Sequence, residues 1–414
     1  MNRPLRFAMV TTFYPPYNFG GDGYAVQRLT HALARRGHAV TVIHDADAFR
    51  SLSDAPEPAP TTTPPGVTVH RLESRAARLS CLATQQTGRP VIHGRTIRRI
   101  LATGFDVIHF HNISLVGGPA VLGYGSGIKL YTAHEHWLVC PTHVLWRHNR
   151  EVCTGRECLR CVLHYRRPPQ LWRSGSLLER QSAHVDEFLT LSDFAARKHA
   201  EFGFSRPLTV IPTFLPDEAA PTGAAPEPTA APYFLFVGRL SRIKGLQDLI
   251  PCFTGEGTTE LWIAGSGEYE PELRALAGNG PRIRFLGQLP PEALRPLYRN
   301  ALAAVVPSAC YEVFPMVVLE AFREGTPIVA RALGPFPEII AASQGGILFE
   351  TQDALERALA ALTDDPALRA RLGAAGLAAF TSRWSESVAL ERYFDVITAV
   401  AERRGIDLTL PGQA

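Results

Sequence analysis

The segment YEVFPMVVLEA, residues 311–321, places two carboxylates, Glu312 and Glu320, on either side of a helix start. Pro315 suits the first position of a helix, because the N–H group that it lacks would have no partner there. The apolar run that follows Pro315 continues to Gly325, which is typical of a helix end. We therefore expect a helix from Pro315 to Gly325, with Glu312 before it and Glu320 inside it.

The start of this helix is also a possible anion site. Backbone N–H groups in the first turn have no partner within the helix, and they form a positive end that binds phosphate. One acid ahead of that end and one beyond it could hold the two ends of a nucleotide diphosphate sugar. The alternative is that both acids are ordinary surface residues beside a buried helix. Motifs elsewhere in the chain are needed to distinguish the two interpretations.

Length and composition indicate a protein of two domains. The chain has 414 residues, of which 20% are charged and 46% hydrophobic, and its net charge is +3. That length exceeds one ordinary core, and that charge is too small to indicate nucleic-acid binding. No apolar run reaches the roughly 18–20 residues that span a bilayer. We expect a soluble cytoplasmic protein.

Short apolar strands alternate with helical stretches along the chain, which predicts parallel βαβ units. In the first half we expect strands at 5–12, 40–44, 67–72, 107–111 and 129–133, with helices at 24–36 and 92–101. In the second half we expect strands at 233–238, 261–264, 282–286, 303–306 and 328–330, with helices at 245–249, 290–300 and from 353 onward.

The Pro/Ala-rich stretch 216–232 separates the two sets and is typical of a linker. The expected architecture is α/β: two doubly wound, Rossmann-like domains that face each other across a cleft. They are an N-terminal domain over 1–215, with a Cys-rich insert at about 140–167, and a C-terminal domain over 233–384. The final helical segment, 385–414, could pack back on the N-terminal domain. Ligands of such sheets bind beyond the carboxyl ends of the strands.

Basic and glycine-rich loops follow the strands of the second domain. Arg239 and Lys244 lie five residues apart in GRLSRIKG, where a guanidinium fork and a compact cation suit phosphate oxygens. Gly265 lies in AGSGE, and glycine there permits close approach of backbone to a ligand. Leu289 ends the similar segment FLGQL. Taken singly, each of these loops could also be an ordinary solvated loop.

Together, these motifs resemble those of the family 4 (group 1) glycosyltransferases, retaining enzymes of the GT-B fold. The resemblance rests on GRLSRIKG, IAGSGEYEPEL, FLGQLPPEAL and the E-x7-E pair with the LEAFREGTPIV that follows. It is strong over 233–349 and looser in the first domain. For the two domains it implies a GT-B fold in which the first is the acceptor side and the second binds the nucleotide sugar. It implies a hexosyltransferase that moves a sugar from a UDP or GDP sugar to a hydroxyl of a saccharide, a lipid-linked or a small-molecule acceptor, in polysaccharide or glycoconjugate assembly.

The resemblance also implies roles for single residues. Arg239 and Lys244 would hold the donor diphosphate, Glu320 the ribose, and Glu312 would face the transferred sugar. Further contacts to the donor are expected from Gly265, Leu289, Phe314, Pro315, Met316 and Val317. Many relatives carry glycine where this chain has Pro315, which removes one amide donor.

Catalysis without a cofactor is the expectation for this site. Cations and helix amides can stabilise the departing nucleoside diphosphate. We expect no Asp-x-Asp motif suggestive of Mg²⁺ coordination at the end of a strand, and we therefore expect metal-independent transfer.

In the first domain the candidates are Gly20, Gly21 and His134. Gly20 and Gly21 lie in a glycine loop that would approach the donor phosphates and the acceptor, although Gly23 stands where many relatives have an acid. His134 lies in TAHEHW, residues 132–137, which resembles an H-D-x-W segment with Glu135 where Asp is common, and would contact the sugar or the acceptor. His111 is a weaker candidate, and His109 is expected to be structural.

Four cysteines lie close together in the sequence, with the spacing C-x12-C-x4-C-x2-C: Cys140, Cys153, Cys158 and Cys161. The closing C-x2-C suits tetrahedral zinc, and four thiolates would complete a structural site. Reduced thiols and disulfides are the alternatives, and disulfides are disfavoured in the cytosol.

An Arg-rich region, residues 71–99, could be a solvated face of the first domain or could attract the protein to the inner face of a membrane that carries a lipid-linked acceptor. Other functions remain open as well: a nucleotide-sugar epimerase or phosphorylase on the same fold, or a non-catalytic nucleotide-sugar-binding protein. The sequence leaves the donor sugar, its base, the acceptor and the oligomeric state undetermined.

Overall fold

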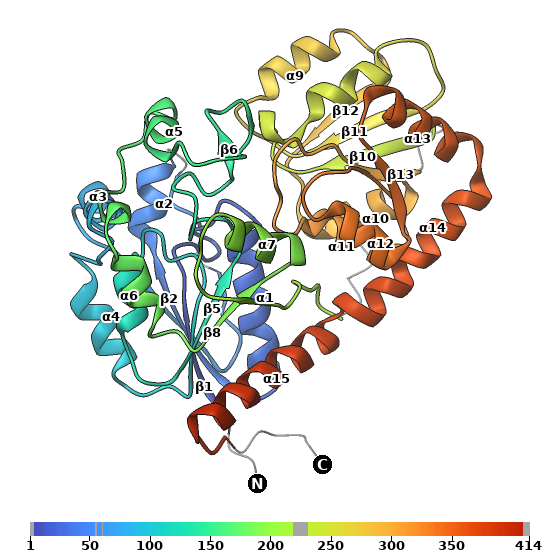
Figure 1. Ribbon diagram of the computed structural model, residues 1–414. Coiled ribbons are helices and arrows are strands. Elements are labelled where there is room, and N and C mark those ends of the chain that lie inside the picture. Colours follow the sequence, from blue (N-terminus) through green and yellow to red (C-terminus); the bar gives the residue numbers. More distant parts are fainter. Residues whose placement is uncertain (1–3, 54–55, 60, 218–230, 409–414) are drawn as a thin grey trace. The chain divides into compact units, whose positions relative to one another are not determined.

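The structure is a computed structural model that describes residues 4–53, 56–59, 61–217 and 231–408 (Figure 1). Its chain divides into two compact units. The first unit comprises Met1–Asn149, Cys153–Pro216 and Ala389–Ala414, and the second comprises Asp217–Val388 with Arg150–Val152. Most of the linker expected over 216–232 lies outside the described residues.

The first unit is built on a seven-stranded parallel sheet with the order β3-β2-β1-β4-β5-β8-β9. Its strands are β1 (Arg6–Val10), β2 (Ala39–Asp45), β3 (Val67–Leu72), β4 (Val107–Phe110), β5 (Ile128–Ala133), β8 (Glu187–Thr190) and β9 (Leu208–Val210). Strand order reverses between β1 and β4, where Phe7 pairs with Val40 on one side and Val107 on the other. Such a reversal is where open α/β sheets bind ligands.

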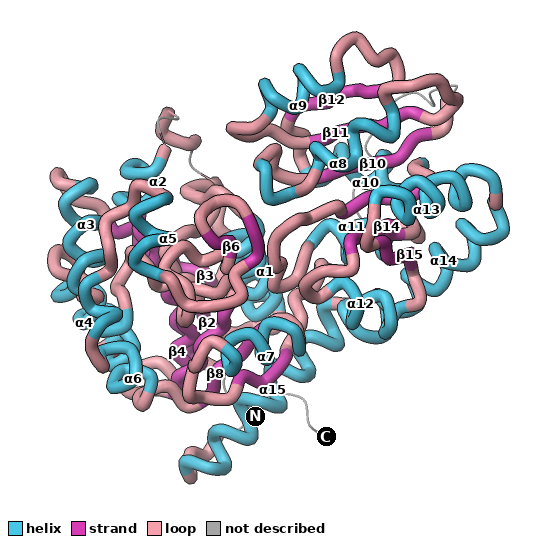
Figure 2. The backbone as a smooth tube through the Cα atoms, turned by 45° about the horizontal axis from the view of Figure 1, so that its top comes forward, coloured by secondary structure: helices cyan, strands magenta, loops and turns pink. Residues whose placement is uncertain are grey.

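Helices cover both faces of this sheet (Figure 2). Alternate residues of β1 serve the two faces, because successive side chains of a strand point in opposite directions. Phe7 and Met9 pack with α1 (Gly21–Arg35) and α15 (Glu386–Arg404), whereas Ala8 and Val10 pack with α4 (Gly94–Leu101) and α6 (Leu177–Ser182). The remaining elements between β1 and β9 are α2 (Ala46–Leu52), α3 (Ala77–Thr87), η1 (Pro119–Gly123), β6 (Trp146–Arg147), β7 (Glu151–Val152), α5 (Cys158–His164), η2 (Leu171–Ser174) and α7 (Asp193–Glu201).

The last helix, α15, packs on the first unit from Ala389 onward. Its Tyr393 hydroxyl lies 3.0 Å from His109 Nδ1, and Arg403 and Arg404 pair with Glu187 and Asp186 at 2.7 and 3.1 Å. None of the helices in the described ranges is long and apolar enough to cross a membrane.

The second unit is built on a six-stranded parallel sheet with the order β12-β11-β10-β13-β14-β15. Its strands are β10 (Tyr233–Val237), β11 (Glu260–Ala264), β12 (Ile283–Gly287), β13 (Ala303–Val306), β14 (Ile328–Arg331) and β15 (Gly346–Phe349). Here the order reverses between β10 and β13, so the loops that follow these two strands mark the expected ligand edge.

The helical elements of the second unit are η3 (Arg242–Lys244), α8 (Leu246–Leu249), η4 (Ile250–Phe253), α9 (Glu270–Ala277), α10 (Pro291–Asn300), α11 (Met316–Arg323), α12 (Phe336–Ser343), α13 (Gln352–Asp364), α14 (Pro366–Ala379) and the π-helical turn η5 (Phe380–Trp384). One core joins α8, α9 and α13 to the sheet, and it includes Phe234, Ile263 and Leu355.

Several expected helix starts are wrong by one to three residues. The helices expected from 92, 245, 290 and 353 begin at Gly94, Leu246, Pro291 and Gln352. Two further starts differ for a clear physical reason. The helix expected over 24–36 begins at Gly21, because its first-turn Gly23 leaves room for the Asn18 side chain: a Cβ there would lie 2.4 Å from Asn18 Oδ1. Pro315 is the residue before the first helical position rather than that position, since its ψ of 118° is extended. The helix end near Gly325 is as expected, with a φ of 71° at that glycine.

Candidate active site

Glycines allow the loops after β10, β11 and β13 to pack backbone against backbone. Gly245 has a φ of 77°, and a Cβ there would lie 1.9 Å from the carbonyl oxygen of Pro307. Gly265, with a φ of 142°, would place a Cβ 1.9 Å from the carbonyl oxygen of Gly238. No larger residue fits either place, so these glycines are required by the strand ends that would carry the donor.

Lys244 and Glu312 meet at this edge, where Lys244 Nζ lies 2.6 Å from Glu312 Oε1. The hydroxyl of Ser308 donates to the same oxygen over 2.8 Å. Burial is the largest influence on the pKa of Lys244 and would lower it, but the charge of Glu312, its hydrogen bond and the nearby Cys310 together raise that pKa. Burial would likewise raise the pKa of Glu312, but the charge and hydrogen bond of Lys244, with the hydrogen bond from Ser308, together hold it below its usual value. The pair is therefore charged at neutral pH.

Arg239 is held more loosely than Lys244. Its Nε lies 3.5 Å from Glu268 Oε2, and the side chains are 64% and 66% exposed. An exposed pair at that distance contributes little stability and is screened by salt. The guanidinium can therefore exchange Glu268 for an anionic ligand at small cost.

Glu320 lies on α11, where its Oε2 accepts a hydrogen bond of 2.8 Å from the hydroxyl of Tyr298 on α10. Tyr298 is almost fully buried, so the carboxylate is oriented by a rigid partner. The ring of Phe314, before the helix, packs against Trp384 with centroids 6.0 Å apart. The backbone of Met316 and Val317 opens α11, and Leu289 lies in the loop between β12 and α10.

In the first unit, the loop after β1 leads directly into α1. Gly20 precedes the helix, Gly21 is its first residue, and the Asn18 side chain donates to the Gly20 carbonyl over 2.7 Å. Asp22 lies in the first turn, and its Oδ2 accepts a hydrogen bond of 3.1 Å from Asn112, which follows β4. The two loops therefore meet at the reversal of the first sheet.

A row of imidazoles follows β4 and β5. His134 Nε2 lies 3.0 Å from His111 Nδ1, and the rings of His111 and His109 are 4.0 Å apart. Burial lowers the pKa of His134 to about 4, and the charge of Asp22 opposes that shift only in part. His134 is therefore neutral at pH 7. His109 Nδ1 lies 3.0 Å from the hydroxyl of Tyr393, and His109 Nε2 lies 2.7 Å from the hydroxyl of Thr132. Both ring nitrogens therefore have partners, which suits a structural role.

The structure adds three residues that sequence reasoning missed: Asp22, Tyr298 and Ser308. Asp22 escaped notice because relatives carry an acid one position later, where this chain has Gly23. Tyr298 and Ser308 orient Glu320 and Glu312, but no spacing in the sequence links them to those acids.

The four clustered cysteines, 140, 153, 158 and 161, line one pocket of the first unit, and all are free thiols. The backbone N–H of His148 donates to Cys161 Sγ over 3.3 Å. Four sulfurs at about 2.3 Å from a zinc ion lie roughly 3.8 Å from one another. In the described ranges, only Asp45, Asp47 and His93 form a set of three possible ligands within 4.8 Å, so the sulfurs are spread more widely than around bound zinc.

Two family models match the chain on either side of the linker. Glycosyltransferase Family 4 matches residues 19–218, and Glycosyl transferases group 1 matches residues 223–378. The chain belongs to the family 4 glycosyltransferases. Membership agrees with the resemblance drawn from the motifs, and it identifies the chain as a glycosyltransferase that uses a nucleotide sugar.

Relatives extend over nearly the whole chain. The glycogen synthase of Mycobacterium tuberculosis is 28% identical in an alignment of 420 positions that covers 91% of this chain and 91% of its own. Sucrose-phosphate synthase from Thermosynechococcus elongatus has a TM-score of 0.71 at 20% identity and covers 95% of this chain and 100% of its own. The Anabaena protein HepE in complex with UDP-glucose has a TM-score of 0.66 at 15% identity, with coverage of 95% and 100%. These structures confirm the GT-B fold, and the named relatives do not favour an epimerase, a phosphorylase or a non-catalytic protein.

Proposed function

We propose that this family 4 glycosyltransferase transfers a hexose with retention of configuration, without a catalytic metal, to a hydroxyl acceptor in polysaccharide or glycoconjugate assembly. The observation that carries the proposal is the Lys244–Glu312 pair at the point where the strand order of the second sheet reverses. A charged lysine that is paired with a carboxylate can bind a diphosphate, because a phosphate oxygen can replace the carboxylate as the partner of the lysine or bind the lysine beside it.

The donor diphosphate would be bound by Lys244, by Arg239 after it leaves Glu268, and by the amides at the start of α11. Lys244 and the helix amides would be in place before the reaction, and together with Arg239 they would stabilise the charge that develops as the nucleoside diphosphate departs. Glu312, freed from part of its interaction with Lys244, would accept hydrogen bonds from the transferred sugar.

Glu320 would hold the ribose. A carboxylate offers about four acceptor positions, and the hydroxyl of Tyr298 uses one of them. The remaining positions suit the two hydroxyls of a ribose. A uridine nucleotide is our first choice of donor, supported by the UDP-glucose complex of the structurally similar HepE.

The acceptor side would be formed by the first unit. Gly20 and Gly21 bring backbone close to the ligand, and His134, neutral at pH 7, can donate or accept one hydrogen bond from a hydroxyl. This assignment predicts that His134→Ala raises the KM for the acceptor more than the KM for the donor.

We also propose a structural zinc site at Cys140, Cys153, Cys158 and Cys161. The segment that carries these cysteines, residues 140–161, would close around the ion. Support comes from the shared pocket and from the amide of His148 that faces Cys161. Metal analysis of protein purified without chelator tests it. We expect the zinc content to fall by one ion per chain in a Cys158→Ser, Cys161→Ser double variant, and the same zinc content in the wild type and the double variant would refute the site.

Peripheral contact with an anionic membrane is proposed for the segment 75–99. Its exposed apolar side chains, Leu79, Leu82, Val91 and Ile92, are 65%, 46%, 59% and 42% exposed. Exposed arginines flank them: Arg75, Arg78, Arg89, Arg95, Arg98 and Arg99. Leucines beside arginines suit insertion into the headgroup region. Flotation with anionic liposomes should be salt-sensitive and should weaken in a Leu79→Ser, Leu82→Ser variant.

Transfer itself is tested by incubating the enzyme with UDP-, GDP- and ADP-hexoses and following the release of nucleoside diphosphate with and without candidate acceptors. We expect release from one nucleotide class, and a large loss in Lys244→Ala. Release that is equal in that variant would refute the proposal for this site.

A further inference from the structure

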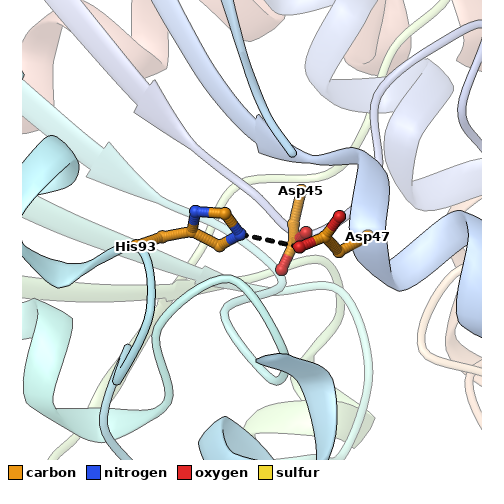
Figure 3. A group of neighbouring side chains, drawn as sticks. All are labelled: Asp45, Asp47 and His93. Carbon is orange, nitrogen blue, oxygen red and sulfur yellow. Dashed lines mark hydrogen bonds and ion pairs between the residues drawn. The ribbon is translucent and has the colours of Figure 1, made fainter. Parts of the chain in front are cut away.

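An Asp-x-Asp motif, Asp45-Ala46-Asp47, lies at the junction of β2 and α2, so the expectation that no such motif stands at a strand end is wrong. Asp45 is the last residue of the strand and Asp47 lies in the first turn of α2. His93, just before α4, comes to the same place from a distant part of the sequence (Figure 3). The three residues are 1%, 0% and 7% exposed, so the group is buried inside the first unit.

Asp47 is held from two sides. Its Oδ2 lies 2.9 Å from Nε2 of His93, and the Ser74 hydroxyl donates to the same oxygen over 2.6 Å. The backbone N–H of Ser74 donates to Oδ1 over 2.9 Å. Ser74 thus orients the carboxylate toward His93, as an outer partner orients a metal ligand.

Asp45 is only half satisfied. Its Oδ1 accepts a hydrogen bond of 3.2 Å from the backbone N–H of Ala48 and so caps α2. Its Oδ2 is buried and has no hydrogen-bond partner among the described residues. An unpaired buried carboxyl oxygen costs free energy, and it marks a position where a ligand would be bound.

The donor atoms are spaced as the ligands of one ion. One atom from each residue lies within 4.8 Å of the others. Two ligands at about 2.1 Å from an ion and at roughly 90° to each other are about 3.0 Å apart. The 2.9 Å between Asp47 Oδ2 and His93 Nε2 fits that edge.

We propose that Asp45, Asp47 and His93 bind one divalent transition-metal ion through two carboxylates and one imidazole nitrogen. This ligand set suits Zn²⁺ or Mn²⁺. The ion would neutralise two buried carboxylates and would tie the end of β2 to the loop before α4. Its role is structural, so sugar transfer without a catalytic metal is unaffected.

The competing occupant is a proton on Asp45. In that case the group is a hydrogen-bonded network that needs no ion, and Asp45→Asn would preserve it, because asparagine keeps an oxygen for the cap on Ala48. If only a proton occupies the group, the wild type and Asp45→Asn both lack a metal site. If the group binds an ion, the wild type binds it and Asp45→Asn weakens the binding.

Mn²⁺ is the probe that separates this site from the cysteines, since manganese prefers oxygen and nitrogen to thiolate ligands. Protein without a polyhistidine tag is stripped with EDTA, exchanged into chelator-free buffer and titrated with Mn²⁺, and free Mn²⁺ is followed by electron paramagnetic resonance. We expect one Mn²⁺ per chain at micromolar concentration and a higher melting temperature in its presence.

Asp45→Asn and His93→Gln should each weaken Mn²⁺ binding by at least about tenfold. In EDTA, the melting temperature of Asp45→Asn should stay near that of the wild type. Glu57→Gln, a carboxylate in the same unit that pairs with Arg50, and Cys158→Ser are the controls and should bind as the wild type. Two results would overturn the proposal: binding by the wild type only at millimolar Mn²⁺, or Mn²⁺ affinity in Asp45→Asn and His93→Gln equal to that of the wild type.

Discussion

Lys244 Nζ and Glu312 Oε1 lie 2.6 Å apart, although 68 residues separate them in the sequence. The two residues follow β10 and β13, which are neighbours only because the strand order of the second sheet reverses there. The fold thus brings a lysine and a carboxylate together at the edge where α/β sheets bind ligands. The pair links the architecture of the second unit to the proposed transfer.

Lys244→Ala should lower kcat by about 10²–10³-fold, since one preorganised group that stabilises developing charge contributes about that much. It should also destabilise the second unit, because the largely buried Glu312 carboxylate then loses the charge of Lys244 and keeps the hydrogen bond from Ser308. The kinetics are therefore measured at a temperature where the variant is folded. Steady-state kinetics with a saturating donor measure the loss. Arg274→Ala is the matched control, because that cation pairs with Glu270 on α9. Similar losses in both variants would contradict a specific role for Lys244.

Tyr298→Phe should weaken nucleotide binding about fivefold, because a hydrogen bond that orients Glu320 contributes about 1 kcal/mol. Tyr233→Phe removes the same atom from a tyrosine whose hydroxyl donates to the Leu297 carbonyl instead. Calorimetric titration of both variants with the nucleotide separates the effects. If Tyr233→Phe weakens binding as much as Tyr298→Phe does, the orientation of Glu320 is not the cause.

Gly245→Ala should destabilise the second unit far more than Gly325→Ala. Both glycines have positive φ, 77° and 71°, where alanine costs about 1–2 kcal/mol. Only at Gly245 would the new Cβ meet backbone, 1.9 Å from the Pro307 oxygen, whereas nothing lies within 4 Å at Gly325. Urea unfolding monitored by hydrogen exchange in the second unit compares them, and equal shifts in midpoint would be the contradictory result.

The first unit should lose stability before the second as the pH falls from about 6.5 to 4. All 14 histidines lie between His31 and His199. Burial lowers the pKa of six of them: His38, His44, His109, His111, His134 and His199. A histidine whose folded pKa is lowered has no effect on stability above its unfolded pKa of about 6.5 and destabilises the native state increasingly as the pH falls below that value. The raised pKa values of Asp22 and Asp45 act in the opposite direction, but they are two groups against six.

In the second unit, the lowered pKa of Glu312 keeps its contribution until the pH falls below about 4.3, the value for an unfolded glutamate. Hydrogen exchange at pH 7.5, 5.5 and 4.5 tests the difference between the units. Peptides of the first unit should lose protection at pH 5.5, and earlier loss in the second unit would contradict the assignment.

Much of the fold could be predicted from apolar runs and their spacing. The strands 67–72 and 303–306 agree with β3 and β13 to the residue: 303–306 is a continuous apolar run, and 67–72 alternates Val67 and Val69 with polar residues, which is the period of a strand. Strands β8, β9 and β15 were not predicted: β8 begins with the charged Glu187, and β9 and β15 are three and four residues long with at most one buried residue.

Contacts between residues far apart in the sequence limited how much of the candidate site could be predicted. The motifs predicted Lys244, Glu312 and Glu320, because each lies in a local pattern. They could not predict the bond from Tyr298 to Glu320, which depends on how α10 packs against α11. The same limit hid His93, which joins Asp47 only after the chain folds.

The most direct test of the account is calorimetric titration of UDP, GDP and ADP into the wild type and Glu320→Ala, with Glu270→Ala on α9 as the control. We predict that one nucleotide, UDP first, binds the wild type and the control with one site per chain, and that Glu320→Ala binds it at least about tenfold more weakly. Equal affinity in Glu320→Ala, or no binding of any nucleotide to the wild type, would contradict the claim that the second unit holds the donor.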